Sequence, residues 1–219
     1  MTTSPISEAP SGGAPLSPTE RTRVRRLSER AATDRQALYD LLDAARICHL
    51  GVIVDGAPRV LPTGYGRDGD TLYLHGSTGA VSLRTDDEIC VTVTHVDGLV
   101  LARSVFHHSI NYRSAVIYGR PRLVTDPDEK LTGLRAIVEN LTPGRWDAAR
   151  RPTRKELAAT AVLALSLDEA SVKTRQGPPG DDEEDYALDV WAGVLPVREV
   201  IGEPVPDPRL RPGIRYSEA

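Results

Sequence analysis

Aromatic side chains are scarce in this 219-residue sequence, which contains one Phe, two Trp and seven Tyr. We therefore expect a core built mainly from Val, Leu, Ile and Ala. Cysteine is also rare, since Cys48 and Cys90 are the only two, and both lie inside apolar runs. Such positions favour reduced, buried thiols in a cytoplasmic protein, although a disulfide or a redox pair stays open at this point.

The sequence has neither a strong net charge nor a long apolar run. Its formal net charge of −4 gives no field that would attract nucleic acid or an anionic membrane. No apolar run approaches the ~20 residues that a membrane-spanning helix needs, and the N-terminus lacks the apolar centre of a signal peptide. We therefore expect a cytoplasmic protein without a nucleic-acid or membrane partner.

Composition divides the chain into one domain and two tails. Residues 1–18 are rich in Ser, Pro, Gly and Thr and hold too few apolar groups to offset the entropy of ordering, so we expect a disordered tail over residues 1–24. Residues 203–219 are rich in proline and are expected to be extended. The folded domain then covers residues 25–202.

Apolar periodicity predicts many short strands with a few helices between them. Helices are expected over Asp34–Ala45 after a Thr33 cap, over Glu129–Leu141 after Asp126-Pro127-Asp128, and over Arg154–Ala159 after Thr153. Turns are expected at Asp55-Gly56, Asp68-Gly69 and Asp97-Gly98. Strands are expected over Ile47–Val54, Arg59–Gly66, Thr71–Leu74, Ile89–His95, Leu99–Val105, Tyr112–Thr125 and Ala161–Ser171, with an exposed loop from Gly177 to Asp185 and a last core element in Tyr186–Val200.

This order of elements indicates a mainly β fold with some α, an antiparallel barrel with covering helices. Alternating βαβ units are absent, and no GxGxxG follows a strand. A Rossmann fold is therefore disfavoured.

The first segment that could carry chemistry is Leu74-His75-Gly76-Ser77-Thr78-Gly79-Ala80. A strand ends here, a glycine turn follows, and a helix is expected to run to about Arg84. Such a turn offers backbone N–H groups and hydroxyls to a phosphate, with Arg84 as a cation. A plain helix cap at Ser77 or Thr78 explains the same residues.

The second and third segments are also polar and lie beside expected strands. Phe106–Ser114 concentrates His107, His108, Tyr112, Arg113 and Ser114 at one end of a strand, where polar groups can point into a pocket. Adjacent histidines on an extended chain point to opposite faces, so a shared metal ion is disfavoured and no metal site is expected.

In the third segment, Lys173 and Arg175 fall on one side of a strand, as an anion contact or an exposed edge pair. Trp191 either fills the core or stacks on a planar ring. Hydrolytic motifs such as GxSxG are missing from the sequence. Chemistry carried by a cofactor is therefore the favoured interpretation.

Three stretches in order, "LYLHGSTG", "VTVTHVDGLVLARSVFHHSINYRSAVIYGRPRLVTDPDEK" and "ELAATAVLALSL…SVKTRQGPPGDDEEDY…VWAGVLP", resemble the pyridoxamine 5'-phosphate oxidase-like superfamily. Within it, the chain is most similar to the flavin-nucleotide-binding branch related to nitroimidazole-resistance reductases. The likeness covers roughly Arg25 to Pro208. It implies an FMN-binding split β-barrel that forms a homodimer, with the FMN at the subunit interface.

The resemblance also implies cofactor-binding positions in this chain. Around the phosphate it implies His75, Gly76, Ser77, Thr78 and Arg84, and beside the flavin ring it implies Leu61, Pro62 and Thr63. It further implies that Tyr112, Arg113 and Ser114 reach the cofactor from the next strand, and that Lys173, Arg175 and Trp191 come from the C-terminal half. Relatives often carry a Ser-Arg or Arg-Lys pair where this chain has Ala80-Val81-Ser82. Without a charged partner at this place, the phosphate would bind more weakly by about 1.5–3 kcal/mol.

We therefore expect an FMN-dependent oxidoreductase that acts on a small molecule. His75 and His108 are the candidate acid–base residues, because histidine titrates near neutral pH. The substrate motif of true pyridoxamine phosphate oxidases is not found. A non-enzymatic flavin-binding or sensing module, or a barrel that binds the deazaflavin F420 or haem, stays open, with His75, His107 and His108 as candidate haem ligands.

Overall fold

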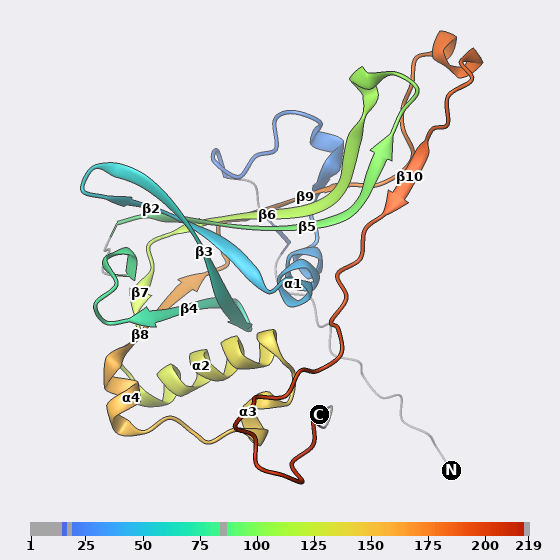
Figure 1. Ribbon diagram of the computed structural model, residues 1–219. Helices are drawn as coiled ribbons and strands as arrows, with labels where there is room; N and C mark the ends of the chain where they lie inside the picture. Colours follow the sequence, from blue (N-terminus) through green and yellow to red (C-terminus); the bar gives the residue numbers. More distant parts are fainter. Residues whose placement is uncertain (1–14, 17–18, 84–86, 217–219) are drawn as a thin grey trace, which may run out of the picture.

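The computed structural model describes residues 15–16, 19–83 and 87–216 (Figure 1). Within these ranges the chain forms one antiparallel sheet in the order β1-β9-β6-β5-β2-β3-β4-β8-β7, and β10 pairs with β5 beside this path. The strands are β1 (Ala31–Ala32), β2 (Ile47–Val54), β3 (Ala57–Asp68), β4 (Thr71–Ser77), β5 (Ile89–Leu101), β6 (Ser109–Gly119), β7 (Arg122–Leu123), β8 (Thr160–Ser166), β9 (Ala170–Arg175) and β10 (Gly193–Pro196).

The sheet curves toward a barrel, but among the described residues its end strands β1 and β7 do not pair with each other. Four α-helices accompany it, namely α1 (Arg35–Ala44), α2 (Pro127–Leu141), α3 (Arg145–Ala148) and α4 (Arg154–Ala159). The expected fold class, mainly β with α in an antiparallel split barrel with covering helices, is confirmed. None of the described helices is long and apolar enough to cross a membrane.

Two apolar clusters hold the sheet and helices together. In the larger cluster, Leu38, Leu41 and Leu42 of α1 are fully buried against the inward side chains of β2, β5, β6 and β9. In the smaller one, Ile137 of α2 packs with Tyr73 of β4 and with neighbours on β8. Because Gly66 has no side chain, the backbone of α2 at Ala136 and Ile137 can lie directly on β3.

The three helices expected over Asp34–Ala45, Glu129–Leu141 and Arg154–Ala159 are confirmed, with small differences at their ends. The carboxylate of Asp34, not the hydroxyl expected at Thr33, caps α1 by accepting from the N–H of Gln36. Asp126 caps α2, and Thr153 caps α4 in a reciprocal capping box with Glu156. The short helix α3 was not expected from the sequence.

The expected hairpin turn at Asp97-Gly98 is wrong, because β5 runs through it without reversing. The pairing of β5 with β6 shifts register between Val96 and Gly98, which makes Asp97 the extra residue of a bulge. The N–H of Val197 donates to the carbonyl of Asp97 over 3.0 Å. The bulge and this hydrogen bond replace the local turn that the dipeptide Asp-Gly favours elsewhere in the chain.

Two expected long strands are each divided. The strand expected over Tyr112–Thr125 is β6 followed by β7, with Pro121 between them, because proline cannot donate to a ladder. The strand expected over Ala161–Ser171 is β8 and β9, which a turn at 167–169 separates.

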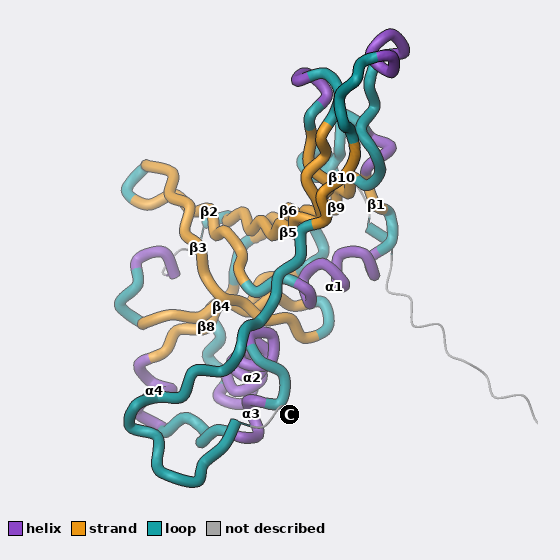
Figure 2. Tube along the Cα trace, turned by 45° about the vertical axis from the view of Figure 1, so that its right-hand side comes forward, coloured by secondary structure: helices purple, strands orange, loops and turns teal. Residues whose placement is uncertain are grey.

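Beyond Gly98, the β5–β6 hairpin projects from the rest of the sheet, with β10 along its edge (Figures 1 and 2). We call this hairpin with β10 the arm; the short 3₁₀ helix η3 (Val105–His107) lies at its tip. The last core element expected over Tyr186–Val200 is wrong, since β10 is an edge strand and Trp191 before it is 65% exposed. Residues 203–216 form no helix or strand.

The loop expected to be exposed over Gly177–Asp185 is only partly so. The side chain of Asp181 is buried, where it accepts from the N–H groups of Arg103 and Ser104 over 2.9 and 3.3 Å. Residues 183–187 form the 3₁₀ helix η4 (Glu183–Ala187). These hydrogen bonds hold the loop against Arg103 and Ser104, which directly precede η3 at the tip of the arm.

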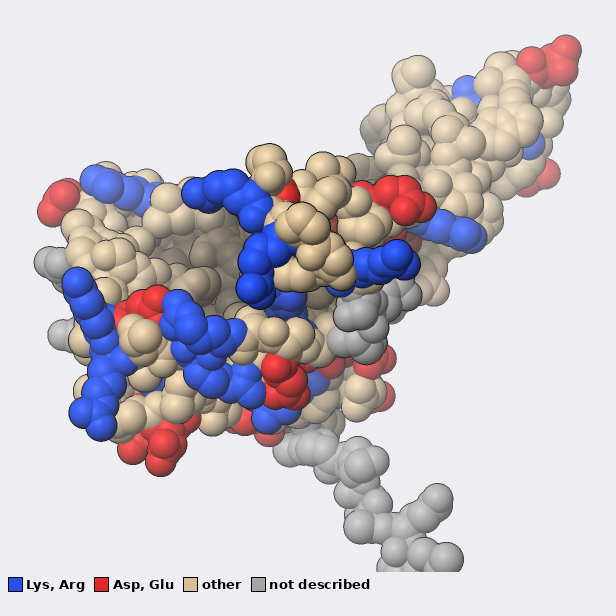
Figure 3. All heavy atoms as spheres, turned by 60° about the horizontal axis from the view of Figure 1, so that its bottom comes forward, with Lys and Arg blue, Asp and Glu red and all other residues tan. Residues whose placement is uncertain are grey.

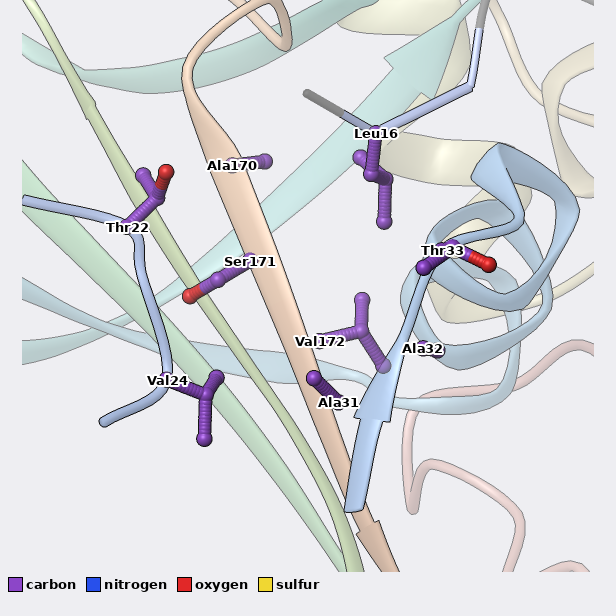
Figure 4. A pocket seen from close by; sticks show the side chains of 9 residues that line it. All are labelled: Leu16, Thr22, Val24, Ala31, Ala32, Thr33, Ala170, Ser171 and Val172. Carbon is purple, nitrogen blue, oxygen red and sulfur yellow. The ribbon is translucent and has the colours of Figure 1, made fainter. Parts of the chain in front are cut away.

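The tail expected to be disordered over residues 1–24 lies largely outside the described residues. Of its described part, Leu16 and Thr22 are buried, and they line a hollow of about 70 Å³ against β1 and β9 (Figure 4). Arg21 donates to Glu88 over 2.6 Å and to Glu169 over 3.2 Å. The packed part of the chain thus begins before residue 25.

Candidate functional site

An open groove of about 720 Å³ follows one face of the β5–β6 hairpin. It is lined by Thr94, Val96, His108, Ser109, Ile110, Tyr112 and Ser114. Thr94 and Val96 pair directly with Ser114 and Tyr112 across the hairpin, and paired residues of antiparallel strands share a face. The groove floor is therefore a set of apolar and hydroxyl side chains, typical of a site for a largely apolar ligand.

The next strand, β9, extends this face with two cations. Lys173 pairs with Ser114 and Arg175 pairs with Tyr112 in the ladder. The ammonium of Lys173 donates to the carbonyl of Arg26 over 3.0 Å, which leaves further donors free for a ligand. Arg175 donates to Asn111 and to carbonyls of the following loop, and burial together with nearby Arg30 lowers its pKa.

The two histidines of the arm tip have different partners. His108 lines the groove, and its Nδ1 lies 3.1 Å from the carbonyl oxygen of Ser104. A carbonyl only accepts, so Nδ1 carries the proton and Nε2 keeps its lone pair. Nε2 of His107 instead contacts the carboxylate of Asp182 at 3.2 Å. Of the two, His108 has the ring nitrogen suited to accept a proton or bind a metal.

Arg113, an expected flavin contact, faces away from the groove. It alternates along β6 with Tyr112 and Ser114, so its side chain lies on the opposite face of the sheet. There its guanidinium donates twice to the carboxylate of Asp97, over 2.9 and 3.1 Å. These hydrogen bonds lower the pKa of Asp97. Arg113 therefore belongs to a separate cluster.

The turn after β4 differs from the phosphate cradle expected there. Its backbone donors are used internally: the N–H of Thr78 donates to Ala159, that of Gly79 to the Ser77 hydroxyl, and that of Ala80 to the Ser77 carbonyl. The expected helix is a single 3₁₀ turn, η2 (Val81–Leu83), and Arg84 lies outside the described residues. Side chains rather than free backbone N–H groups would have to hold a phosphate here.

His75 stands at the end of β4 without a hydrogen bond to any described residue. Partial desolvation lowers the pKa of its imidazole, which favours the neutral ring, while the residue remains exposed to solvent. The neighbouring Gly76 packs closely on η2, because a Cβ there would lie 2.6 Å from Leu83 Cδ1 and would displace that side chain. A neutral, unpartnered histidine keeps a lone pair for an external ligand.

The implied cofactor residues fall into two groups in one chain. The turn group comprises His75 to Thr78 on β4 with Leu61, Pro62 and Thr63 on the adjacent β3; the groove group comprises Tyr112, Ser114, Lys173 and Arg175. Strands β4 and β6 are four strand spacings apart, or about 19 Å measured along the curved sheet, whereas β3 is two spacings, or about 10 Å, from the groove strand β5. The turn and the arm also lie at opposite ends in Figures 1 and 2.

Trp191 joins neither group. Its ring lies over Gly193, where a Cβ would be 2.9 Å from the indole, and the side chain is 65% exposed. The interpretation of Trp191 as a core residue is therefore wrong. An exposed indole beside an edge strand is available for contact with another molecule.

Charge on the helical side of the molecule is mixed. Figure 3 shows Lys and Arg side chains interspersed with Asp and Glu on the face that carries α3, α4 and the C-terminal tail. Arg150 pairs with Glu156 at 2.8 Å and Arg151 with Asp147 at 2.7 Å. The cations of this face thus do not form a region of one sign.

Thr94 and Val96 were missed as groove residues, although a signal for them exists. In the β5 sequence they alternate with buried Val91 and Val93, which places them on the outward face once the strand is known to continue. The expected turn at Asp97-Gly98 concealed that continuity.

Comparison with known proteins gives consistent results. The sequence profile described as pyridoxamine 5'-phosphate oxidase matches residues 34–174. A flavocytochrome, Anf3 of Azotobacter vinelandii, is 43% identical with a TM-score of 0.86, over 93% of this chain and 96% of its own. A FAD- and haem-binding protein of Mycobacterium smegmatis is 40% identical with a TM-score of 0.81, over 86% and 94%.

A third solved structure, a nitroimidazole antibiotic resistance protein of Bacteroides thetaiotaomicron described as putative, shares the fold. It is 23% identical with a TM-score of 0.55, over 65% of this chain and 85% of its own. No functionally curated protein matches the sequence.

Proposed function

Because this chain belongs to the pyridoxamine 5'-phosphate oxidase family, we propose that it is a flavin- and haem-binding oxidoreductase that works as a homodimer. The single observation that carries the proposal is the identity of 40% and 43% to two proteins whose names include haem or a flavocytochrome, over most of the chain. One of those names specifies FAD. We therefore propose FAD as the flavin, in place of the FMN expected from the sequence.

The chemistry of the groove fits a flavin. Its apolar and hydroxyl floor suits a planar ring system, and Lys173 and Arg175 on the same face suit the anionic phosphates. A bound flavin would supply the electron transfer, while these side chains would bind and orient it. The turn group, with His75, Ser77 and Thr78, offers the remaining polar contacts.

The separation of the two groups supports the homodimer. In one chain the turn after β4 and the groove residues of β6 lie about 19 Å apart along the curved sheet, and each flavin site would combine the turn of one subunit with the groove of its partner. Exposed apolar side chains on the arm fit such an interface, since Val105 and Phe106 at its tip are 90% and 85% exposed. Trp191 would then contact the partner's flavin.

For haem, the geometry favours His108 as the ligand. Its Nδ1–H is held by the Ser104 carbonyl, the arrangement in which a histidine presents Nε2 to iron. His75 is neutral and without a partner among the described residues, which makes it the second choice. His107 is the least suitable, because its Nε2 already contacts Asp182.

Replacement of single histidines tests this assignment. We expect His108→Ala to remove the haem absorbance while the flavin absorbance stays, and His107→Ala to keep both. If His75→Ala is the only variant that loses haem, His75 in the turn after β4 is the ligand. Haem retained in all three variants would refute histidine ligation from these positions.

Turnover decides between an enzyme and a sensing module. We expect the purified protein to accept electrons from a nicotinamide cofactor and pass them to oxygen or a small nitro compound. The two thiols, Cys48 and Cys90, are free, which fits work in the reducing cytoplasm. Bound flavin that no donor or acceptor oxidises or reduces at a useful rate would favour a non-enzymatic module.

A further inference from the structure

A second pocket, of about 410 Å³, lies on the other side of the sheet from the groove. Its lining comprises Ala44, Arg46, His95, Asp97, Val197, Arg198, Glu199 and Ile201. His95 and Asp97 alternate along β5 with the groove residues Thr94 and Val96, so the sheet separates the two sites. A ligand in this pocket would therefore leave the groove accessible.

The floor of the pocket is a fixed polar cluster. Nη2 of Arg113 lies 2.9 Å from Asp97 Oδ1 and 3.1 Å from His95 Nδ1, and His95 Nδ1 itself lies 3.2 Å from Asp97 Oδ1. In the tautomer whose Nδ1 accepts from Arg113, the ring proton of His95 is on Nε2. The floor thus presents an N–H donor, while Arg113 already neutralises the Asp97 carboxylate.

The bulge in β5 holds the chain segment that covers the pocket. Residues Val197 to Ile201 follow β10, and the N–H of Val197 donates to the carbonyl of Asp97 over 3.0 Å. At Gly98 a Cβ would lie 2.9 Å from Val194 Cγ1, so glycine permits the close approach of β10. This segment lies beyond residue 174, where the match to the family profile ends.

The remaining charges of the pocket favour an anion. Neither Arg46 nor Arg198 has a hydrogen bond or ion pair with a described residue, and Glu199 is the only carboxylate of the described lining besides the neutralised Asp97. Two such guanidinium groups beside one carboxylate leave a net positive charge. Guanidinium geometry matches a carboxylate or phosphate oxyanion. Ala44, Val197 and Ile201 add an apolar wall.

From these contacts we propose that the pocket binds a small organic carboxylate with a short apolar body. Its oxyanion lies between Arg46 and Arg198 and accepts from His95 Nε2, and its apolar body packs on Ala44, Val197 and Ile201. Binding here does not depend on the flavin or haem assignment, because the sheet lies between the two sites.

Calorimetric titration of the purified holoprotein with butyrate, acetate and inorganic phosphate tests the proposal. We expect butyrate to bind about tenfold more tightly than acetate, since two more methylenes are buried. Phosphate, which has no apolar body, binds more weakly than butyrate. Arg46→Gln and Arg198→Gln each lower butyrate affinity about tenfold. Arg23→Gln, which removes an exposed arginine outside the pocket lining, leaves it unchanged.

Three results would overturn the proposal: no butyrate binding, phosphate or acetate binding as tightly as butyrate, or an equal loss in Arg23→Gln. The absorption spectrum and thermal unfolding of each variant report whether it folds. If Arg46→Gln is unfolded, Arg198→Gln carries the test, because Arg198 is exposed on a segment without regular structure. Failure of the flavin assignment alone would alter the spectrum and leave butyrate binding intact.

Discussion

Mixing two defective subunits tests whether each flavin site is shared between chains. We would reverse charge in the groove group with Lys173→Glu and add charge in the turn group with Ser77→Asp. The side chain of Lys173 hydrogen-bonds only the carbonyl of Arg26 among the described residues, and Ser77 is exposed, so both chains are expected to fold. Each variant alone should lose flavin, because Lys173→Glu replaces a cation beside the anionic phosphates and Ser77→Asp adds an anion to another part of the site for the anionic flavin.

The size of that loss follows from simple electrostatics. Reversing a charge about 4 Å from a phosphate changes the energy by up to ~8 kcal/mol at an effective dielectric constant of about 20. Solvent screening at these partly exposed positions reduces this to about 2–4 kcal/mol. Flavin affinity should then fall by about 30- to 1000-fold. Lys155→Glu, the same reversal at an exposed position of α4, should leave affinity unchanged.

Mixed dimers, isolated through two different affinity tags, give the decisive count. If the turn of one chain and the groove of its partner form each site, a mixed dimer has one site with both defects and one with none. It should therefore bind one flavin, against two in the wild-type dimer. If both groups act on one flavin within a single chain, every site carries a defect and no flavin is recovered. Flavin-free mixed dimers would refute the shared site.

Three further predictions concern stability and reactivity. Gly66→Ala should lower the free energy of unfolding, measured in urea, by about 3 kcal/mol, because its Cβ meets the α2 backbone at Ala136 and Ile137. Gly180→Ala should leave the free energy of unfolding unchanged, because nothing lies within 4 Å of a Cβ there. Equal effects of the two variants would contradict the packing argument. Hydrogen bonds from Arg150 and Thr153 lower the pKa of Glu156 to about 2. The free energy of unfolding that Glu156 adds relative to Glu156→Gln should therefore be fully present above about pH 4.5 and vanish as the pH falls through about 2. If this free-energy difference grows on acidification, the sign is wrong. Burial raises the pKa of the Cys48 thiol to about 12, so iodoacetamide should modify half-buried Cys90 first, and earlier modification of Cys48, seen by peptide mass spectrometry, would contradict its burial.

The dipeptide Asp-Gly shows where local sequence is sufficient to predict a hairpin turn and where it is not. Asp55-Gly56 was expected to form a hairpin turn and does, with φ of 53° and 74°. Asp97-Gly98 carries the same signal, yet Gly98 does not adopt a positive φ and the strand continues. The difference arises from partners distant in sequence, Arg113 and Val197, which no local pattern contains.

Helix starts were easier to predict, because their causes are local. The caps at Asp126 and Thr153 follow from one side chain and a nearby N–H. The cap of α1 fell on Asp34 rather than Thr33, since both residues can cap and only packing fixes where the first turn begins. The segment Tyr186–Val200 was misjudged because its apolar residues resemble a core element but lie exposed along a sheet edge.

At the candidate site, residue types were predictable and their grouping was not. Tyr112 and Ser114 were expected beside a pocket and line the groove, and strict alternation would already have separated Arg113 from them. The separation of the β4 turn from the groove required the strand order, which depends on pairings far apart in sequence. Membership of the family came instead from motifs in order along the chain.

The absorption spectrum of the purified protein, followed by mass spectrometry of the ligands released on denaturation, tests the central claim most directly. We predict flavin and haem bands in one sample, the mass of FAD, and about one of each cofactor per chain. A colourless protein that takes up neither flavin nor haem on titration would contradict the proposed function.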